Sequence, residues 1–175
     1  MIKHNIPPLY SACSRVLILG SFPSVLSRQA EFFYGHPQNR FWRVLSAIFN
    51  QPLPMNIAEK KELVLSHRLA LWDVIGSCDI TGSADSSIRN VRANDVAALL
   101  EHCPIRQIFV NGKTAARYYD RYLLKDLGLA AQCLPSTSPA NAAYSLPKLI
   151  TAWQCVATAA QADSDLSGAA PKPKG

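Results

Sequence analysis

Short apolar runs alternate with amphipathic segments along the chain, and this alternation predicts an α/β domain. Four runs have the length and composition of buried strands. They span residues 16–19, 69–75, 105–110 and 129–134. The segments between and after them have the spacing or composition of helices. These segments span residues 41–49, 58–67, 94–103, 113–124 and 146–160. Strands that alternate with helices in this way indicate a mostly parallel sheet.

The stretches between these elements are predicted to be irregular. Residues 21–39 form a long loop, and residues 76–93 form a polar loop rich in Gly, Ser and Asp. Asn94 is expected to cap the helix that follows it. The last stretch, 161–175, is small and polar and is predicted to be a disordered tail. We therefore expect one domain over residues 1–160, without internal repeats.

Composition and charge narrow the class of protein. The 175 residues are 49% hydrophobic and 17% charged, which suits a chain with a single core. A net charge of +6 fits a polyanionic partner, and it fits an ordinary basic enzyme equally well. No apolar run approaches the roughly 18–20 residues of a membrane span, and the N-terminus has no stretch typical of a signal peptide. We expect a soluble, cytoplasmic protein.

The first segment with candidate chemistry follows the first predicted strand. It opens with GSFPS at 20–24 and continues with FYGHPQNRFW at 33–42. Aromatic side chains can stack on an extruded base, each stack contributing on the order of 1–3 kcal/mol. The Asn39 amide carries both a donor and an acceptor, so it can hold a water in one orientation. Asn39 fits a helix N-cap equally well, and Phe41 and Trp42 fit the core face of the helix.

Two further candidates follow later strands. LPSTSPAN at 134–141 places three consecutive hydroxyl residues between prolines. Such a rigid, uncharged loop can offer hydroxyl and backbone N–H groups to phosphates, although it also fits a Ser/Thr turn before the last helix. Asp73 ends the second strand, where a carboxylate can hydrogen-bond a base edge or be a solvated turn residue. Loops at the carboxyl ends of parallel strands meet at one edge of the sheet, where ligands bind.

In combination, these motifs resemble the uracil-DNA glycosylase superfamily. The pattern is G-x-x-P-S after the first strand, then H-P-x-N-x-F-W, then P-S-T-S-P, and the resemblance covers about residues 15–155. Within the superfamily it resembles most the hypoxanthine-DNA glycosylases, often called family 6. LPSTSPAN is also similar to the corresponding loop of thymine-DNA glycosylases. The resemblance implies a three-layer α/β/α fold with a short, mostly parallel four-stranded sheet, which binds a base flipped out of DNA.

Two positions depart from the best-known uracil enzymes of the superfamily. Phe22 stands where those enzymes carry an Asp that activates water, and Leu134 stands where they carry a His that stabilises the leaving base. Family 6 enzymes take the polar group from later in the first segment, at the position that matches Asn39. The resemblance therefore favours hypoxanthine, the deaminated base of deoxyinosine, over efficient removal of uracil.

Roles for individual residues follow from this resemblance. Asn39 would place the attacking water. Phe22 and Tyr34 would flank the base, with Phe33 as a further wall, while Asp73 would contact the base edge. His36 would lie in the same pocket. The expected DNA contacts come from Ser24, Ser136, Thr137, Ser138 and Asn141. Arg89, Arg92, Lys113 and Lys148 can add general electrostatic attraction to DNA, although each of them also fits scattered surface charge.

The expected partner is double-stranded DNA that contains a deaminated base, bound by a monomer without a protein partner. No metal or organic cofactor is implied, because the five cysteines are scattered and form no C-x-x-C pair. Three other interpretations stay open. The same fold can act on uracil, mismatched thymine or xanthine. The missing Asp and His also suit a non-catalytic DNA-lesion binder, and a strand-end pocket suits an enzyme for small nucleosides or nucleotides.

Overall fold

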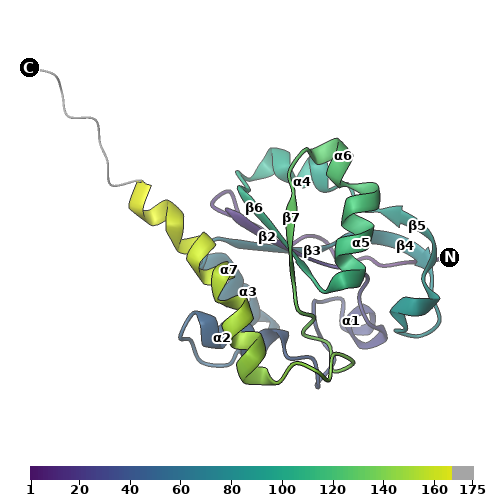
Figure 1. Ribbon diagram of the computed structural model, residues 1–175, viewed down its shortest axis with the longest axis horizontal. Helices are drawn as coiled ribbons and strands as arrows, with labels where there is room; N and C mark the ends of the chain where they lie inside the picture. Colours follow the sequence, from purple (N-terminus) through teal and green to yellow (C-terminus); the bar gives the residue numbers. More distant parts are fainter. Residues whose placement is uncertain (167–175) are drawn as a thin grey trace, which may run out of the picture.

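Four parallel strands form the central sheet of the computed structural model, which describes residues 1–166 (Figure 1). The order is β3-β2-β6-β7. The strands are Val16–Gly20 (β2), Leu69–Asp73 (β3), Gln107–Asn111 (β6) and Ala131–Leu134 (β7). All five residues of the central strand β2 are buried, which is typical of a strand covered on both faces. The predicted four-stranded parallel sheet is confirmed.

Helices cover both faces of this sheet and produce three layers (Figure 1). Val16 and Ile18 of β2 belong to one core cluster, and Leu17 and Leu19 belong to the other. The first cluster includes side chains of α2 (Phe41–Ile48), α3 (Ile57–Ser66) and α7 (Leu146–Leu166). The second includes side chains of α4 (Val96–His102) and α5 (Lys113–Tyr122), with α6 (Leu124–Leu127) beside them. None of the helices within residues 1–166 has the length and apolarity to span a membrane.

The structure contains a second, antiparallel sheet that the sequence pattern does not predict. Its strands are β1 (Ile2–Lys3), β4 (Ile75–Asp79) and β5 (Arg89–Ala93), in the order β1-β4-β5. The loop expected over residues 76–93 is therefore wrong for most of its length. The run expected as one strand over residues 69–75 is divided between two strands. The Val74 N–H donates to the Gly20 carbonyl at the end of the parallel sheet, and from Ile75 the chain pairs in the antiparallel sheet.

Three smaller expectations are also corrected. The short helix α1 (Val25–Ala30) lies within the expected loop 21–39. Asp95 caps α4, with its carboxylate accepting the Ala98 N–H, whereas the side chain of Asn94 donates to the Asp73 carbonyl. Helix α7 continues to Leu166, beyond the helix end expected at residue 160 and into the predicted tail. The rest of that predicted tail, residues 167–175, lies outside the described part of the chain.

Candidate active site

A cavity of about 410 Å³ opens at the carboxyl edge of the parallel sheet. Gly20, Asp73 and Asn111, the last residues of three neighbouring strands, line it. The loops that follow strands β2 and β7 and the turn between β4 and β5 complete the walls. Pockets of this volume hold small molecules and single nucleobases. The cavity thus lies where a parallel sheet is expected to bind its ligand.

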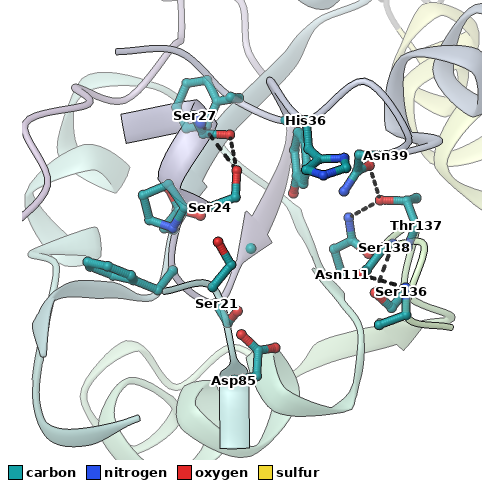
Figure 2. A pocket seen from close by; sticks show the side chains of 18 of the residues that line it. Ser21, Ser24, Ser27, His36, Asn39, Asp85, Asn111, Ser136, Thr137 and Ser138 are labelled. Atoms are coloured by element: carbon teal, nitrogen blue, oxygen red, sulfur yellow. Dashed lines mark hydrogen bonds between the residues drawn. The ribbon is translucent and has the colours of Figure 1, made fainter. Parts of the chain in front are cut away.

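The two motif-bearing loops, almost 100 residues apart in the sequence, are joined by hydrogen bonds (Figure 2). The Thr137 hydroxyl donates to Asn39 Oδ1 over 2.9 Å, and the Arg40 N–H donates to the Thr137 carbonyl over 3.0 Å. The Arg40 guanidinium reaches further along the same loop, to the carbonyls of Ser138 and Asn141. These contacts fix the segment around Asn39 against the PSTSP loop, on one wall of the cavity.

Asn39 is held in a defined orientation. Its Oδ1 accepts the Phe41 N–H over 2.9 Å in addition to the Thr137 hydroxyl. Phe41 begins α2, and the formal N-cap residue, Arg40, makes no side-chain capping bond, so Asn39 does stabilise the helix start. Because two donors occupy its oxygen, the Asn39 group left to interact with a molecule in the cavity is the NH₂. The helix-capping role and the pocket role are therefore compatible.

Thr137 is the buried member of the three hydroxyl residues in the PSTSP loop. Its side chain is fully buried, its hydroxyl contacts Asn39 and Asn111, and its N–H donates to Asn111 Oδ1 over 3.0 Å. The hydroxyl and the N–H are thus engaged within the protein, and the DNA contact predicted for Thr137 stays a prediction. Ser136 and Ser138 on either side remain half-buried and line the cavity.

Aromatic rings form part of the cavity wall. Phe22 is buried, with the His4 ring edge-on at 5.4 Å and the Arg28 guanidinium 5.2 Å from its centre. Tyr34 has a positive φ of 52°, which is uncommon for a bulky residue, and stacks on Phe41 at 3.9 Å. Phe33 also lines the cavity, although most of its surface belongs to the core. The core positions expected for Phe41 and Trp42 are confirmed.

Asp73 is a buried carboxyl on the cavity wall. Burial raises the pKa of Asp73 to about 7, because removal from water penalises the charged form. The same effect, together with the neighbouring Asp73, raises the pKa of the Tyr34 phenol. Asp73 Oδ2 has no hydrogen-bond partner among the described residues. The Asn111 side chain lies beside the Tyr34 hydroxyl and opposes the rise in its pKa. Gly20 lies directly against both side chains, and a Cβ there would stand only 2.6 Å from Asp73 Oδ1.

The remaining predicted residues divide into two groups. His36 and Ser24 line the cavity. The His36 Nδ1 accepts the Gln38 N–H, so the neutral ring carries its proton on Nε2. Asn141 does not line the cavity and instead donates to the Ser136 carbonyl, which shapes the loop. The four predicted electrostatic residues are exposed on the surface outside the cavity, namely Arg89, Arg92, Lys113 and Lys148.

Several cavity residues are absent from the sequence-based prediction. Asn111 ends β6, Ser21 follows β2, and Asp85 projects from the η1 turn (Asp85–Ser87) of the β4–β5 hairpin (Figure 2). Asn111 was detectable, because it occupies the same strand-end position as Asp73. Asp85 was not, since its position depends on a hairpin that the polar composition of the segment concealed.

Comparison with known proteins identifies the family. The family model described as the uracil DNA glycosylase superfamily matches residues 7–158. The chain belongs to this superfamily. Its members remove bases from DNA, so the chain is a DNA glycosylase.

Three similar proteins support the assignment. A hypoxanthine DNA glycosylase of Methanosarcina acetivorans is 38% identical over 147 residues, covering 83% of this chain and 92% of that protein. A hypoxanthine DNA glycosylase of Methanosarcina barkeri is 32% identical over 143 residues, covering 81% and 89% respectively. The solution NMR structure of a candidate uracil DNA glycosylase from M. acetivorans superposes with a TM-score of 0.79 at 33% identity, over 92% of this chain and 99% of that one.

Proposed function

We propose that this glycosylase removes hypoxanthine from deoxyinosine in double-stranded DNA and leaves an abasic site. It acts as a cytoplasmic monomer whose single domain spans residues 1–160. The observation that carries the proposal is the fixed amide of Asn39, which lies beside a cavity of about 410 Å³. The names of the two relatives at 38% and 32% identity support hypoxanthine as the base.

The orientation of Asn39 defines its chemistry. With Oδ1 engaged by Phe41 and Thr137, the NH₂ group donates a hydrogen bond to the oxygen of the attacking water. The water keeps a second lone pair, which attacks the anomeric carbon of the sugar. An amide cannot remove a proton efficiently, so the glycosidic bond breaks ahead of attack: the base leaves with the bonding electron pair and the sugar becomes cationic. The proton that the water loses on attack then neutralises the departed base. Catalysis in this site depends on positioning and electrostatics.

The proposed seat of the base lies between Phe22 and Tyr34, with its edge toward Asp73 and with His36 in the same pocket. Extrusion of the nucleotide costs a few kcal/mol, and less for a mismatched base. Flanking phosphates meet the hydroxyls of Ser24, Ser136 and Ser138 at the rim, while Asn141 shapes the rim from behind.

Uracil is the second candidate base. The specific observations in its favour are the superfamily match over residues 7–158 and the similar solved structure, which is described as a candidate uracil DNA glycosylase. Phe22 and Leu134 replace the Asp and His of efficient uracil enzymes, so uracil removal is expected to be slower than hypoxanthine removal.

The test is a single-turnover assay on labelled duplexes that carry deoxyinosine, deoxyuridine or deoxyxanthosine, with alkali to reveal abasic sites. Cleavage is expected to be fastest at deoxyinosine. Asn39→Ala should lose at least about 100-fold in rate while retaining DNA affinity, because Asn39 contacts the water and no phosphate. Asn5→Ala, on the exposed N-terminal segment, is the matched control.

A second variant separates chemistry from folding. Asn39→Asp keeps the oxygen that accepts from Phe41 and Thr137, and it replaces the NH₂ donor by a carboxylate oxygen that can take a proton from the water. It should therefore fold normally and cleave faster than Asn39→Ala. Cleavage by Asn39→Ala at the wild-type rate would overturn the catalytic assignment. DNA binding without cleavage of any of the three substrates would favour a lesion-binding protein.

A further inference from the structure

A second carboxyl group lies at the mouth of the cavity. Asp85 belongs to the turn of the β4–β5 hairpin and lines the cavity beside Ser21 (Figure 2). Among the described residues that line the cavity, only Asp73 and Asp85 are acidic. Asp73 is buried, whereas Asp85 is exposed. The two carboxyl groups therefore differ in depth, with Asp73 on the inner wall and Asp85 near the opening.

The turn that carries Asp85 is attached to the helix on the other side of the opening. The Ser83 hydroxyl accepts the Val25 N–H over 3.0 Å, and the Gly82 carbonyl accepts a hydrogen bond of 3.3 Å from the Arg28 guanidinium. Both donors belong to α1. The turn is therefore held in place by the protein itself, and it presents Asp85 to the cavity before any ligand arrives.

The surroundings of the Asp85 carboxyl separate it partly from water. Burial raises the pKa of Asp85, and the neighbouring Thr114 and Ser21 side chains and the Arg117 charge oppose this rise. The hydroxyls of Thr114 and Ser21 also limit the orientations of the carboxyl. A carboxylate that is partly removed from water attracts a nearby cation more strongly than one in bulk water.

The position of Asp85 limits the part of a nucleotide that it can contact. An extruded nucleotide enters a cavity base first, so groups at the opening meet its deoxyribose and its phosphates. A carboxylate repels a phosphate, which leaves the deoxyribose. In the proposed mechanism this sugar becomes cationic, and the side chains of Asn39 and Phe22 have no negative charge with which to stabilise it.

We propose that Asp85 is a catalytic residue that stabilises the cationic deoxyribose by direct electrostatic attraction. The inference rests on the proposed function, because the sugar becomes cationic only as the glycosidic bond breaks. The electron pair of that bond leaves with the base, and Asp85 neither gains nor loses a proton. Asn39 and Asp85 lie on different walls of the cavity (Figure 2), so the sugar can lie between the attacking water and the carboxylate.

This attraction is stronger in the transition state than with intact DNA. The deoxyribose is neutral before the bond breaks, and the flanking phosphates are repelled by the carboxylate. Asp85 therefore accelerates the chemical step without tightening the binding of the substrate. An acidic residue on a surface that binds a polyanion is explained in the same way, since it opposes binding and favours the reaction.

The experiment measures binding to two duplexes that differ in charge at one sugar. In one, a pyrrolidine replaces the target nucleotide, and its protonated ring nitrogen mimics the cationic deoxyribose. In the other, the replacement is a neutral tetrahydrofuran of similar shape. The wild-type protein should bind the pyrrolidine duplex more tightly. Asp85→Asn keeps an oxygen beside Ser21 and Thr114 and removes the charge, so this preference should fall at least about 10-fold.

Single-turnover cleavage of deoxyinosine by Asp85→Asn should also slow at least about 10-fold. Its affinity for the tetrahydrofuran duplex should be unchanged or higher, because removal of a negative charge does not weaken attraction to phosphates. Slower chemistry with undiminished binding is the signature of lost transition-state stabilisation and differs from that of misfolding. Asp126→Asn, exposed on α6, is the matched control and should keep both the preference and the rate.

A third variant distinguishes charge from support of the turn. Thr114→Val removes the hydroxyl beside Asp85 and keeps the carboxylate, so it should retain most of the preference for the pyrrolidine duplex. An equal loss of preference in Thr114→Val and Asp85→Asn would reduce Asp85 to a structural residue and overturn the inference.

The failure of this inference is distinguishable from failure of the proposed function. An unchanged preference for the pyrrolidine duplex in Asp85→Asn overturns the inference, and cleavage of deoxyinosine by the wild-type protein then leaves the function standing. If the wild-type protein does not cleave deoxyinosine, the proposed function is rejected. A preference for the cationic duplex that requires Asp85 would still support the same role for Asp85 with another base.

Discussion

The orientation of the Asn39 amide is set by a chain of hydrogen bonds that starts on strand β6. The Asn111 side-chain NH₂ donates to Thr137 Oγ1 over 2.9 Å, and Thr137 Oγ1 donates in turn to Asn39 Oδ1 over 2.9 Å. Each oxygen in the chain accepts a hydrogen bond from the previous group, so only one arrangement of donors is consistent. Thr137 is therefore a positioning residue for Asn39.

Thr137→Val tests this positioning role. Valine has the same shape, so packing is kept, while Asn39 Oδ1 loses one donor and the buried Asn111 NH₂ loses its acceptor. We expect a loss of about 1–3 kcal/mol in the free energy of unfolding and about a 10-fold loss in single-turnover rate. DNA affinity should not change, because the Thr137 side chain is fully buried.

Thr158→Val, at an exposed position of helix α7, is the control and should match the wild-type protein in stability and rate. A weaker affinity for DNA in Thr137→Val, without a slower chemical step, would instead support the phosphate contact that the sequence suggested.

The sequence shows which loops carry the site but not which side chain within a loop does what. Ser136, Thr137 and Ser138 are indistinguishable as hydroxyl residues, and only the buried position of Thr137 separates its role from that of its neighbours. Asn39 was equally compatible with a helix cap and with catalysis. Its two oxygen contacts explain why no choice between them was possible from the sequence.

At the scale of elements, the loop after β7 is attached to α2 through one arginine. The Arg40 guanidinium donates to the carbonyls of Thr137, Ser138, Asn141 and Tyr144. The planar guanidinium has five N–H donors in a fixed geometry, which suits several carbonyls at once. These bonds shape residues 137–144 before DNA arrives, and they place a positive charge beneath the loop.

Arg40→Lys keeps the charge and removes the multiple bonding. An ammonium cannot reach four carbonyls, so we expect a loss of about 1–3 kcal/mol in the free energy of unfolding. Hydrogen exchange should become faster in residues 137–144, and DNA affinity should decrease. Arg43→Lys, on the exposed side of α2, is the matched control. Unchanged exchange in the loop would show that Arg40 is not its anchor.

Helix α5 carries a row of cations that begins beside the cavity. Lys113, Arg117 and Arg121 are exposed and four residues apart, so they share one helical face. Arg117 and Arg121 lie over the rings of Tyr118 and Tyr122, at 5.0 and 5.3 Å, which limits their freedom. The helix starts two residues after Asn111, so this face suits the phosphates of the DNA that flanks the extruded base.

Replacement of these three cations by alanine should reduce the salt dependence of DNA binding. Each phosphate contact contributes about 0.9 to the slope of log K against log salt, so the triple variant should lose about 2–3 in slope. The rate at saturating enzyme should stay unchanged, since none of the three lines the cavity. Lys61→Ala on α3 is the control. An unchanged slope of log K against log salt would mean that the flanking DNA binds a face of the protein other than this face of α5.

Elements with strong patterns were predictable, and those whose composition conflicts with their structure were not. The four parallel strands are short, nearly all-apolar runs. Strand β4 contains Gly76, Ser77 and Asp79, which indicate a loop by composition. It becomes a strand because β1 and β5 pair with it on either side. Such pairing is a tertiary effect that local propensity does not contain.

At the scale of the whole molecule, the fold keeps the Asp73 carboxyl in an environment that disfavours its charged form. Asp73 lies between the parallel sheet and the antiparallel sheet, where the chain leaves β3 for β4. Burial leaves its Oδ2 without a partner and raises its pKa to about 7, compared with about 3.9 in an unfolded chain. Natural proteins keep such destabilising groups chiefly where function requires them.

The sign of the pH effect follows from proton binding. Between about pH 4 and about pH 7 the folded state holds a proton on Asp73 that the unfolded state has released, so raising the pH favours unfolding. Below about pH 4 Asp73 is protonated in both states. Above about pH 7 it is ionised in both states, and the destabilisation of the folded protein no longer increases. The wild-type protein should therefore lose at most about 4 kcal/mol through this group across that window.

Asp73→Asn removes the titratable group. The difference in unfolding free energy between variant and wild type therefore reports the titration of Asp73 alone, because all other groups are the same in both proteins. Measured by urea denaturation, this difference should be small near pH 4, grow in favour of the variant up to about pH 7, and then stay constant. Asp126→Asn, which is exposed, should show a flat difference. A flat difference for Asp73→Asn would mean that the carboxylate is as well solvated in the folded protein as in the unfolded chain. A growing one would show that burial of the Asp73 carboxylate destabilises the folded protein, as expected for a group kept in the cavity for function.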